Sequence, residues 1–393
     1  MVPEGWRRKR VDQLFHVQLG KMLNKQAKVG GDQHVYLTNK NVRWGSFALA
    51  ELNSMSFSDC EREKFSLWDG DLLVCEGGEI GRCAIWRGAV ANCYYQKALH
   101  RLRRRSDEVD VEFVFNVFLF GSTNKLFSGL GTQTSIAHLT KERLSEISIL
   151  LPPLPEQKKI AEILSTWDRA IEVAERQLEN ARRQKKALMQ QLLTGTRRLP
   201  GFDGEWKTVK LGDVCELVNG RGFKPHEWSD EGYPIIRIQN LNGSDEFNYY
   251  NGSFNPKLLV VPGDLLFAWS GSRGTSFGPH IWNGPKAVLN YHTWNVKPRR
   301  DLDKVFFYWL LQQITAEIEN SAHGAAALVH TQKREMEKRL ISVPQIEEQK
   351  QLAETMGLFL QDEELCYRKL VGLRSEKRAL MQQLLTGKKR VTV

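Results

Sequence analysis

The segment ALMQQLLTG at residues 187–195 occurs a second time at residues 379–387, which is 192 positions further along a chain of 393 residues. The same offset aligns Glu156-Gln157-Lys158 with Glu348-Gln349-Lys350 without a gap. A period of about 20 to 50 residues is typical of solenoids, whereas a much longer period indicates whole repeated domains. The sequence therefore predicts a tandem duplication in which each copy is a globular domain followed by a conserved connecting element.

The conserved elements have the pattern of long helices. Prolines at positions 152, 153 and 155 end any preceding element, and a helical pattern runs from Glu156 to Gly195 with apolar spacings that alternate between four and three. Each helix should have about 38 residues and a length of about 57 Å. The predicted helix-helix seam consists of Ile160, Leu164, Trp167, Ile171, Leu178, Leu188 and Leu192 in the first copy and Leu352, Met356, Phe359, Leu370, Leu373, Leu380 and Leu384 in the second.

A seam this narrow favours a helix as its partner, and the chain must return between the two copies, so we expect the helices to pack antiparallel. The alternative is that each helix packs only on its own globular domain. The predicted fold class is α+β, with two mixed α/β domains that have curved β-sheets, two long antiparallel coiled-coil helices that join them, and pseudo-twofold symmetry. We place the first domain at residues 1–151 and its helix at residues 152–199. The second domain should span residues 200–343, and its helix residues 344–393.

The globular portions correspond more loosely than the helices. Gly70-Asp71-Leu72-Leu73 parallels Gly263-Asp264-Leu265-Leu266, and short apolar runs separated by Gly and Asn are typical of strands. We expect helices at residues 111–120 and 304–314 and strands at residues 72–75, 98–102, 235–238, 265–269 and 293–296.

Composition narrows the class of protein. The formal net charge of +10 suggests a polyanionic partner such as nucleic acid. The six cysteines form no C-x-x-C pair, which predicts free thiols and no metal site. The apolar runs are too short to cross a bilayer, so we expect a soluble, cytoplasmic protein with no membrane partner.

Motifs for catalysis are missing from the sequence. It has no G-x-x-x-x-G-K-[ST] loop, no H-E-x-x-H and no nucleophile elbow. Glu156 and Glu348 resemble half of a nuclease motif, but they fall in the first turn of each predicted helix, where the helix dipole favours a carboxylate. We therefore predict that the chain has no catalytic residues and is not an enzyme.

Two divergent domains, each followed by a proline-rich Glu-Gln-Lys segment and a long helix ending in Leu-Leu-Thr-Gly, resemble the specificity subunit of Type I restriction–modification enzymes. The resemblance rests on residues 151–161 and 343–353, on the two ALMQQLLTG segments, and on Gly131-Thr132-Gln133-Thr134-Ser135-Ile136, and it covers essentially the whole chain. The second copy departs from the first because Gln345-Ile346-Glu347 replaces Pro153-Leu154-Pro155.

The resemblance implies a non-catalytic DNA-recognition subunit with two target recognition domains. The helices would set the gap between two half-sites about 34–36 Å apart and would dock two modification (methyltransferase) subunits. It implies that the chain holds no cofactor, because S-adenosylmethionine and ATP would be bound by the modification subunits and by separate motor and nuclease restriction subunits. The expected target is double-stranded DNA with an asymmetric bipartite site.

Candidate DNA contacts are polar residues in glycine-rich loops, which can pair with bases or phosphates. They are Gly77, Gly78, Arg82, Thr132, Gln133, Thr134 and Ser135 in the first domain and Arg221, Lys224, Gln239, Asn240, Ser272, Arg273 and Thr275 in the second. Basic residues near the helix ends, among them Arg198 and Arg390, either complement the helix dipole or contact DNA or a partner.

One alternative function is a helical protein–protein scaffold whose globular domains bind a partner other than DNA. Salt-sensitive, sequence-dependent binding to duplex DNA distinguishes the two hypotheses, because phosphate contacts make affinity fall with salt.

Overall fold

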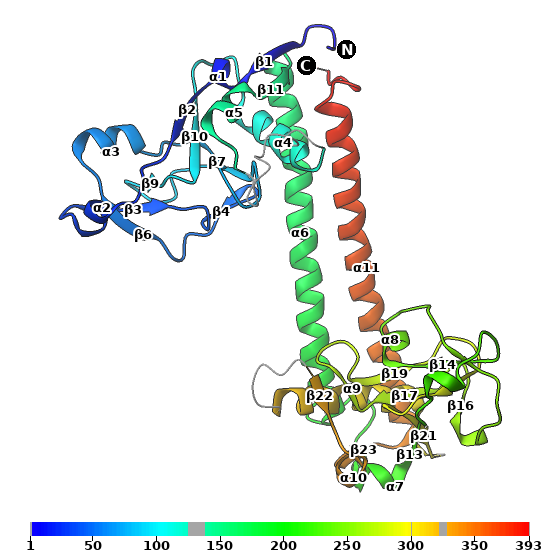
Figure 1. The fold of residues 1–393 in the computed structure, drawn as a ribbon. Coiled ribbons are helices and arrows are strands. Elements are labelled where there is room, and N and C mark those ends of the chain that lie inside the picture. Colours follow the sequence, from blue (N-terminus) through cyan, green and yellow to red (C-terminus); the bar gives the residue numbers. More distant parts are fainter. Residues whose placement is uncertain (1, 125–137, 300, 322–327, 393) are drawn as a thin grey trace. The chain divides into compact units, whose positions relative to one another are not determined.

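The computed structural model describes residues 2–124, 138–299, 301–321 and 328–392, and it forms two compact units (Figure 1). The first unit comprises Met1–Glu175 and Arg368–Val393, and the second comprises Arg176–Tyr367. Each unit contains one globular domain and parts of both long helices, α6 (Leu154–Leu193) and α11 (Ile346–Leu384). The two predicted long helices are thus confirmed, with 40 and 39 residues.

The domain of the first unit is built on antiparallel sheet. β2 (Phe15–Leu19), β10 (Leu99–Arg104), β7 (Leu72–Cys75) and β8 (Cys83–Ile85) form a four-stranded sheet in this order. A second sheet has the order β6-β3-β9, in which β3 and β9 are parallel. The strands of this second sheet are β3 (Gln33–Leu37), β6 (Asn53–Ser56) and β9 (Tyr94–Tyr95). Two smaller ribbons pair β1 (Arg7–Arg10) with β11 (Ser148–Leu151) and β4 (Val42–Arg43) with β5 (Ser46–Phe47). The helices of the domain are α1 (Val11–Leu14), α2 (Lys25–Val29), α3 (Asp59–Phe65), α4 (Val111–Thr123) and α5 (Lys141–Glu146).

The second unit repeats this plan with its own four-stranded sheet, in the order β13 (Cys215–Asn219), β21 (Thr293–Pro298), β17 (Leu265–Ala268) and β19 (Gly278–Ile281). A second sheet has the order β15-β14-β20-β16, with β14 and β20 parallel. The strands of this second sheet are β14 (Tyr233–Ile236), β15 (Tyr249–Tyr250), β16 (Leu259–Val260) and β20 (Ala287–Leu289). Two ribbons pair β12 (Lys207–Lys210) with β23 (Leu340–Val343) and β18 (Ser270–Ser272) with β22 (Leu328–His330). The helices of the domain are α7 (Leu211–Val214), α8 (Ile238–Leu241), α9 (Lys304–Ser321), α10 (Lys333–Lys338) and the 3-10 helices η1 (Pro225–Glu227) and η2 (Pro256–Leu258).

The two domains differ mainly in one segment. Corresponding strands are offset by 200 residues at β2 and β13 (215 − 15) and by 192 residues at β11 and β23 (340 − 148). Most of this change in offset arises between β2 and β7, because residues 20–71 of the first domain correspond to the shorter segment 220–264 of the second. The shared sheet is therefore a common scaffold, and this segment is where the domains diverge.

Most predicted short elements are confirmed, with small shifts at their ends. The strand at residues 72–75 is reproduced, whereas the strand predicted at residues 235–238 ends earlier, because residue 238 begins α8. The predicted helices at residues 111–120 and 304–314 extend to Thr123 and Ser321. Asp110 caps α4, since its side chain accepts a hydrogen bond from the Phe113 amide.

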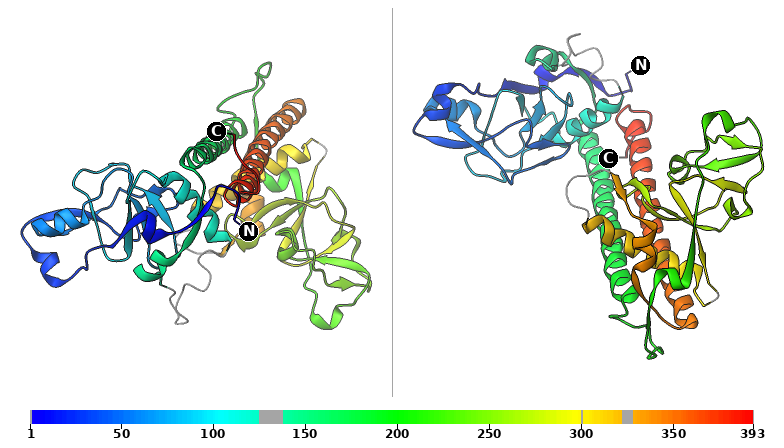
Figure 2. Two further views of the ribbon diagram at one scale, coloured as in Figure 1. Left: turned by 90° about the horizontal axis from the view of Figure 1, so that it is seen from above. Right: turned by 60° about the horizontal axis from the view of Figure 1, so that its bottom comes forward.

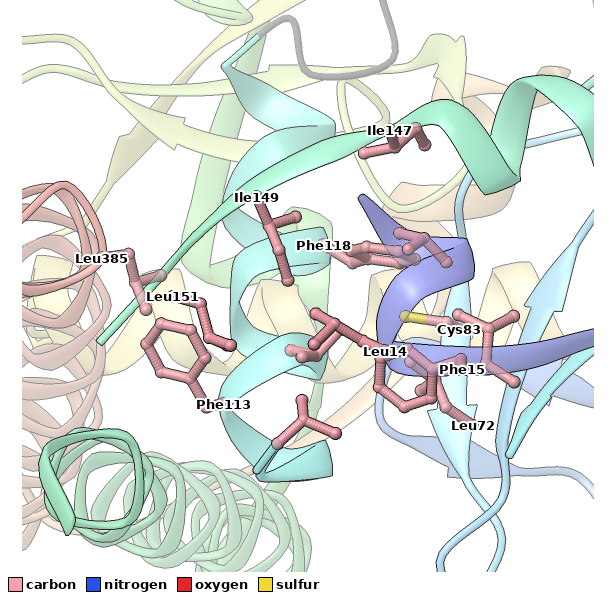
Figure 3. Packing of buried hydrophobic residues seen from close by; sticks show 14 of the residues in the cluster. Leu14, Phe15, Leu72, Cys83, Phe113, Phe118, Ile147, Ile149, Leu151 and Leu385 are labelled. Carbon is pink, nitrogen blue, oxygen red and sulfur yellow. The ribbon is translucent and has the colours of Figure 1, made fainter. Parts of the chain in front are cut away.

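The core of the first unit lies where the sheet, α4 and the long helices meet. Figure 3 shows Phe113 and Phe118 of α4 packed among Leu14, Phe15 and residues of β7, β8 and β11. Ile160, Leu164 and Leu384 belong to the same buried cluster, and Leu192, Leu352 and Met356 lie in the corresponding cluster of the second unit. The ends of the predicted seam thus pack on the globular domains as well as between helices.

Within each unit the parts of α6 and α11 lie side by side and run antiparallel (Figure 2). In the first unit Asp168 of α6 pairs with Lys377 of α11 at 2.5 Å, and Glu175 pairs with Arg374 at 2.6 Å. The later residue of α6 thus binds the earlier residue of α11, which shows that the helices run antiparallel. In the second unit Arg182 and Lys185 bind Glu363. These ion pairs contradict the alternative in which each helix packs only on its own domain.

The charged residues that interrupt the seam find partners across the helix pair. Lys185 and Lys377 each bind a carboxylate of the facing helix, Glu363 and Asp168. The hydrogen bond from Lys185, followed by that from Arg182, lowers the pKa of Glu363. The remaining seam residues Trp167, Ile171, Leu188, Phe359, Leu373 and Leu380 are half-buried, and Leu178 and Leu370 are buried.

Both long helices end in the same glycine turn. Gly195 and Gly387 have φ angles of 71° and 68°, a region that favours glycine. In each turn an amide beyond the glycine reaches back six residues, from Arg197 to the Gln191 carbonyl and from Lys389 to the Gln383 carbonyl, both at 3.1 Å. The conserved Leu-Leu-Thr-Gly sequence is therefore a helix stop signal.

Candidate nucleic-acid interface

Gly77, Gly78 and Arg82 lie in the loop that joins β7 to β8. Arg82 donates hydrogen bonds to the Asn39 carbonyl and side chain at 3.0 and 3.2 Å, and the Asn39 amide donates to the Gly77 carbonyl at 2.8 Å. Asn39 and Arg82 together brace the loop. The structure thus gives Arg82 a role in shaping the hairpin, and its contact with DNA stays a prediction.

The candidates of the second domain that follow β17 occupy the corresponding hairpin. Ser272 ends β18, its amide donates to the Ser276 hydroxyl at 2.8 Å, and the Thr275 hydroxyl donates to the Ser272 carbonyl at 3.3 Å. Arg273 and Thr275 are exposed. In each domain one group of candidates therefore falls on the hairpin after the same core strand, although no residue is shared. Thr132, Gln133, Thr134 and Ser135 of the first domain lie outside the described residues.

Arg221 is the second residue of the divergent segment of the second domain. Its guanidinium donates to Glu227 at 2.7 Å and lies over the rings of Phe223 and Tyr250 at 4.3 and 5.0 Å. Gly220 precedes it, and a side chain there would collide with the Asn290 carbonyl, because an added Cβ would be 1.9 Å from that oxygen. The backbone at Arg221 is thus fixed by a close approach between two segments.

Lys21 occupies the same place in the first domain, and sequence reasoning missed it. Lys21 and Arg221 each form an isolated parallel bridge, with Gln96 and Asn290. The Lys21 amine donates to Glu61 at 2.6 Å and lies 4.9 Å from the centre of the Phe57 ring. An alignment at an offset of 200, the offset that pairs Trp6 with Trp206, would have revealed the equivalence.

The remaining candidates of the second domain separate into exposed and buried groups. Lys224 and Gln239 are exposed, whereas Asn240 is buried. The Asn240 side chain accepts from the Arg237 amide at 3.0 Å and donates to the carbonyls of Ser244 and Glu246 at 3.0 and 2.9 Å. Its hydrogen-bonding groups thus close the turn around α8, so Gln239 is the better placed of the two for contact with DNA.

This difference predicts opposite outcomes for two neighbouring substitutions. Asn240→Ala should lower the free energy of unfolding by about 2 kcal/mol, because it removes three hydrogen bonds made by a buried side chain. Gln239→Ala should change stability by less than about 0.5 kcal/mol, as for other exposed side chains, and should weaken sequence-specific DNA binding instead. Thermal unfolding and DNA-binding titrations of both variants test the pair. A stable Asn240→Ala protein would show that the turn does not depend on this side chain.

A cavity of about 710 Å³ lies beside the hairpin of the second domain. Its lining includes Asn242, Thr275, His280, Tyr308 and Gln312. Burial lowers the pKa of His280, whose Nε2 lies 3.0 Å from the Ser276 carbonyl. The cavity thus brings the Thr275 loop and the turn after α8 to one polar surface, while the hairpin of the first domain lies in the other unit.

The carboxylate predicted at the start of each long helix is buried, which the sequence did not indicate. Glu156 and Glu348 are each 2 % exposed, and each receives two hydrogen bonds from one arginine, Arg390 at 2.6 and 2.8 Å and Arg198 at 2.7 Å twice. The indole N–H of Trp6 or Trp206 donates to the same carboxylate at 3.2 Å. Arg198 and Arg390 therefore anchor the end of one helix to the start of the other.

Among the described residues, no group of three or more His, Cys, Asp or Glu side chains could hold a metal ion. The six cysteines are free. No helix in the described part of the chain is both long enough and apolar enough to span a membrane.

Comparison with known proteins finds one family. The family model for the Type I restriction modification DNA specificity domain matches residues 3–182 and 203–365. The chain is 26% identical to the Type I restriction enzyme MjaVIII specificity subunit of Methanocaldococcus jannaschii, over 99% of this chain and 94% of that protein. It is 24% identical to the putative type I restriction enzyme MjaX specificity subunit of the same organism, over 99% and 95%.

Solved structures have the same fold. One chain, from a study of complex assembly and conformational transition of the type I R-M system, has a TM-score of 0.69 at 17% identity and covers 99% of this chain and 100% of that one. The HsdS subunit from Thermoanaerobacter tengcongensis has a TM-score of 0.56 at 18% identity, with 99% and 98% covered.

Proposed function

Because this chain belongs to the family of the Type I restriction modification DNA specificity domain, we propose that each of its two domains reads one half of an asymmetric bipartite site in double-stranded DNA. One observation carries this proposal. The domains share a four-stranded sheet, yet the hairpins after β7 and β17 carry different residues, Gly77, Gly78 and Arg82 against Ser272, Arg273 and Thr275. Two domains that share a scaffold but differ in their contact residues would recognise two different DNA sequences.

We further propose that the two helices set the gap between the half-sites and dock two modification subunits. Exposed apolar residues on α11 support docking, since Leu358 and Leu365 are 64% and 67% exposed. The positions 192 residues earlier are Thr166 and Val173, so the two helix surfaces differ and the two modification subunits would be bound with different strength. The motor and nuclease restriction subunits would join the same complex.

In this assignment the chain selects the site and takes no part in the chemistry. S-adenosylmethionine would be bound by the modification subunits, and ATP by the motor subunits, so this chain would need no cofactor of its own. The absence of phosphate-loop and metal-protease motifs from the sequence supports this division of labour.

The proposal is tested by mapping methylated adenines in DNA from cells with and without this chain. We expect a bipartite set of modified sites that appears only when the chain is present. Exchange of the segment 220–264 for that of another member of the family should change one half of the site and leave the other unchanged. A modification pattern that does not depend on the chain would contradict the proposal.

A further inference from the structure

The first domain carries a cluster of cationic residues on one face of its main sheet. In the antiparallel pair β2–β10, His16 lies opposite Arg103, and Gln18 lies opposite Arg101. Directly opposed residues of an antiparallel pair project from the same face. These four residues, together with Arg105 and Lys141, line a cavity of about 470 Å³. We call this set the arginine pocket.

The arginine pocket has more positive than negative charge. Asp71 neutralises Arg103, which lies 2.6 Å from it, and Asp12 pairs with Arg10. Arg101, Arg105 and Lys141 have no carboxylate partner within 4.0 Å among the described residues. Partial burial, and then the charges of Arg105, Arg101 and Arg103, lower the pKa of His16.

The buried guanidinium of Arg101 gives a second, independent indication that the arginine pocket binds an anion. The residue is only 7% exposed, and its guanidinium donates to the carbonyls of Lys64 and Ser66 at 3.1 and 2.8 Å. Its buried Nε has no hydrogen-bond partner within the described part of the chain. Buried N–H groups of this kind are normally satisfied, so an unpaired guanidinium N–H among further cations indicates a place for an anion.

The corresponding face of the second domain is built differently. Its strand register pairs Glu216 with Lys297 and Val218 with Asn295, so a glutamate replaces His16 and an asparagine replaces Arg101. Glu216 binds Lys257 at 3.1 Å, and the Lys333 amine, which takes the place of Lys141, donates to the Leu217 carbonyl at 2.6 Å. Arg299 takes the place of Arg105, and Lys297 takes the place of Arg103.

We propose that the arginine pocket binds a phosphate group of the DNA backbone and that the second domain has no counterpart, so DNA is held more strongly at the half-site of the first domain. This assignment rests on the proposed function. A phosphate carries a full negative charge and offers only acceptor oxygens, which suits a pocket of cationic donors. Contacts of this kind fix the position of a protein on DNA without reading its sequence.

The test compares matched variants of the two domains in the complex with modification subunits. Binding to a 40-bp duplex of random sequence is measured over a series of salt concentrations. Arg105→Ala should lower the magnitude of the slope of log K against log salt by about 0.9, the value for one lost phosphate contact. Arg299→Ala, at the equivalent position, should lower it less. Equal effects of the two variants would overturn the pocket as a special site.

A second pair of variants exchanges residues between the domains and keeps the Arg105 side chain, which donates to the carbonyls of Asp12 and Phe15 at 2.8 and 3.1 Å. His16→Glu, which copies the second domain, should weaken binding several-fold and reduce the salt slope. Glu216→His should leave the slope unchanged or raise its magnitude. Both positions are exposed, so folding is preserved and can be checked by thermal unfolding. Unchanged binding by His16→Glu would overturn the proposal.

Histidine NMR separates DNA from free phosphate as the source of the anion. The charged groups around His16 are Arg101 and Arg103 of β10, Arg105 just after it, and Lys141 of α5. A bound phosphate favours the protonated imidazole, so the duplex should raise the pKa of His16, and binding should strengthen as the pH falls through that pKa. A rise with inorganic phosphate but not with the duplex would overturn the assignment to the DNA backbone, and a rise with neither would overturn the pocket. Failure of the wild-type complex to bind any duplex, with a normal phosphate response, would count against the proposed function.

Discussion

Replacing Gln157 with methionine is expected to lower the free energy of unfolding of the first unit by about 3 kcal/mol, because it leaves one buried and two partly buried backbone groups without partners at about 1 to 3 kcal/mol each. The Gln157 side chain is fully buried and has the size of methionine. It accepts from the Asp110 amide at 2.8 Å and donates to the carbonyls of Glu108 and Pro152 at 2.9 and 2.8 Å. These bonds join the start of α6 to the loop before α4.

Denaturant unfolding and amide hydrogen exchange of the Asp110 N–H measure the effect. The neighbouring Lys158→Ala is the matched control, since Lys158 is exposed and should leave stability within about 0.5 kcal/mol of the wild type. Gln349→Met should have the same effect in the second unit, where Gln349 binds the Asp303 amide and the carbonyls of Asp301 and Pro344. Unchanged protection of Asp110 in Gln157→Met would show that the three bonds do not hold the helix start.

The same Glu-Gln-Lys segments show what could and what could not be predicted from the sequence. The repeat located them at the start of each long helix, and helix-dipole reasoning explained why a carboxylate is tolerated there. It could not show that Glu156 and Gln157 are buried, because their partners Arg390, Trp6 and Glu108 are 234, 150 and 49 residues away. Only folding brings these groups together, so local reasoning could place Glu156 in the first turn of the helix but could not identify its partners.

The long helices and the core strands could be predicted because their signals are periodic and local. The candidate interface was harder, since a loop residue such as Asn240 looks the same in sequence whether it closes a turn or contacts a base. Arg101 and His16 were not proposed at all, because β10 and β2 bring them together across 85 residues (101 − 16) of sequence. Reading the repeat at both offsets, 200 and 192, would have identified Lys21 but not this pocket.

Deleting one heptad from each long helix is expected to abolish modification at the original sites. Removal of residues 168–174 of α6 and of the facing residues 372–378 of α11 takes out both members of the Asp168–Lys377 pair and keeps the seam in phase. Each helix becomes shorter by about 10 Å, since the rise is about 1.5 Å per residue. At about 3.4 Å per base pair this distance corresponds to about three base pairs of the gap.

Three base pairs also turn the duplex by about a third of a turn, since one turn has about 10.5 base pairs. The shortened chain should therefore either select sites whose gap is shorter by about three base pairs or bind no bipartite site, and in both cases methylation of the original sites is lost. Deletion in α6 alone, which destroys the register of the ion pairs, is the control and should lower stability as well as binding. Methylation mapping in cells with each variant gives the answer. Unchanged modification of sites with the original gap, by a stably folded double deletion, would show that the helices do not set the spacing.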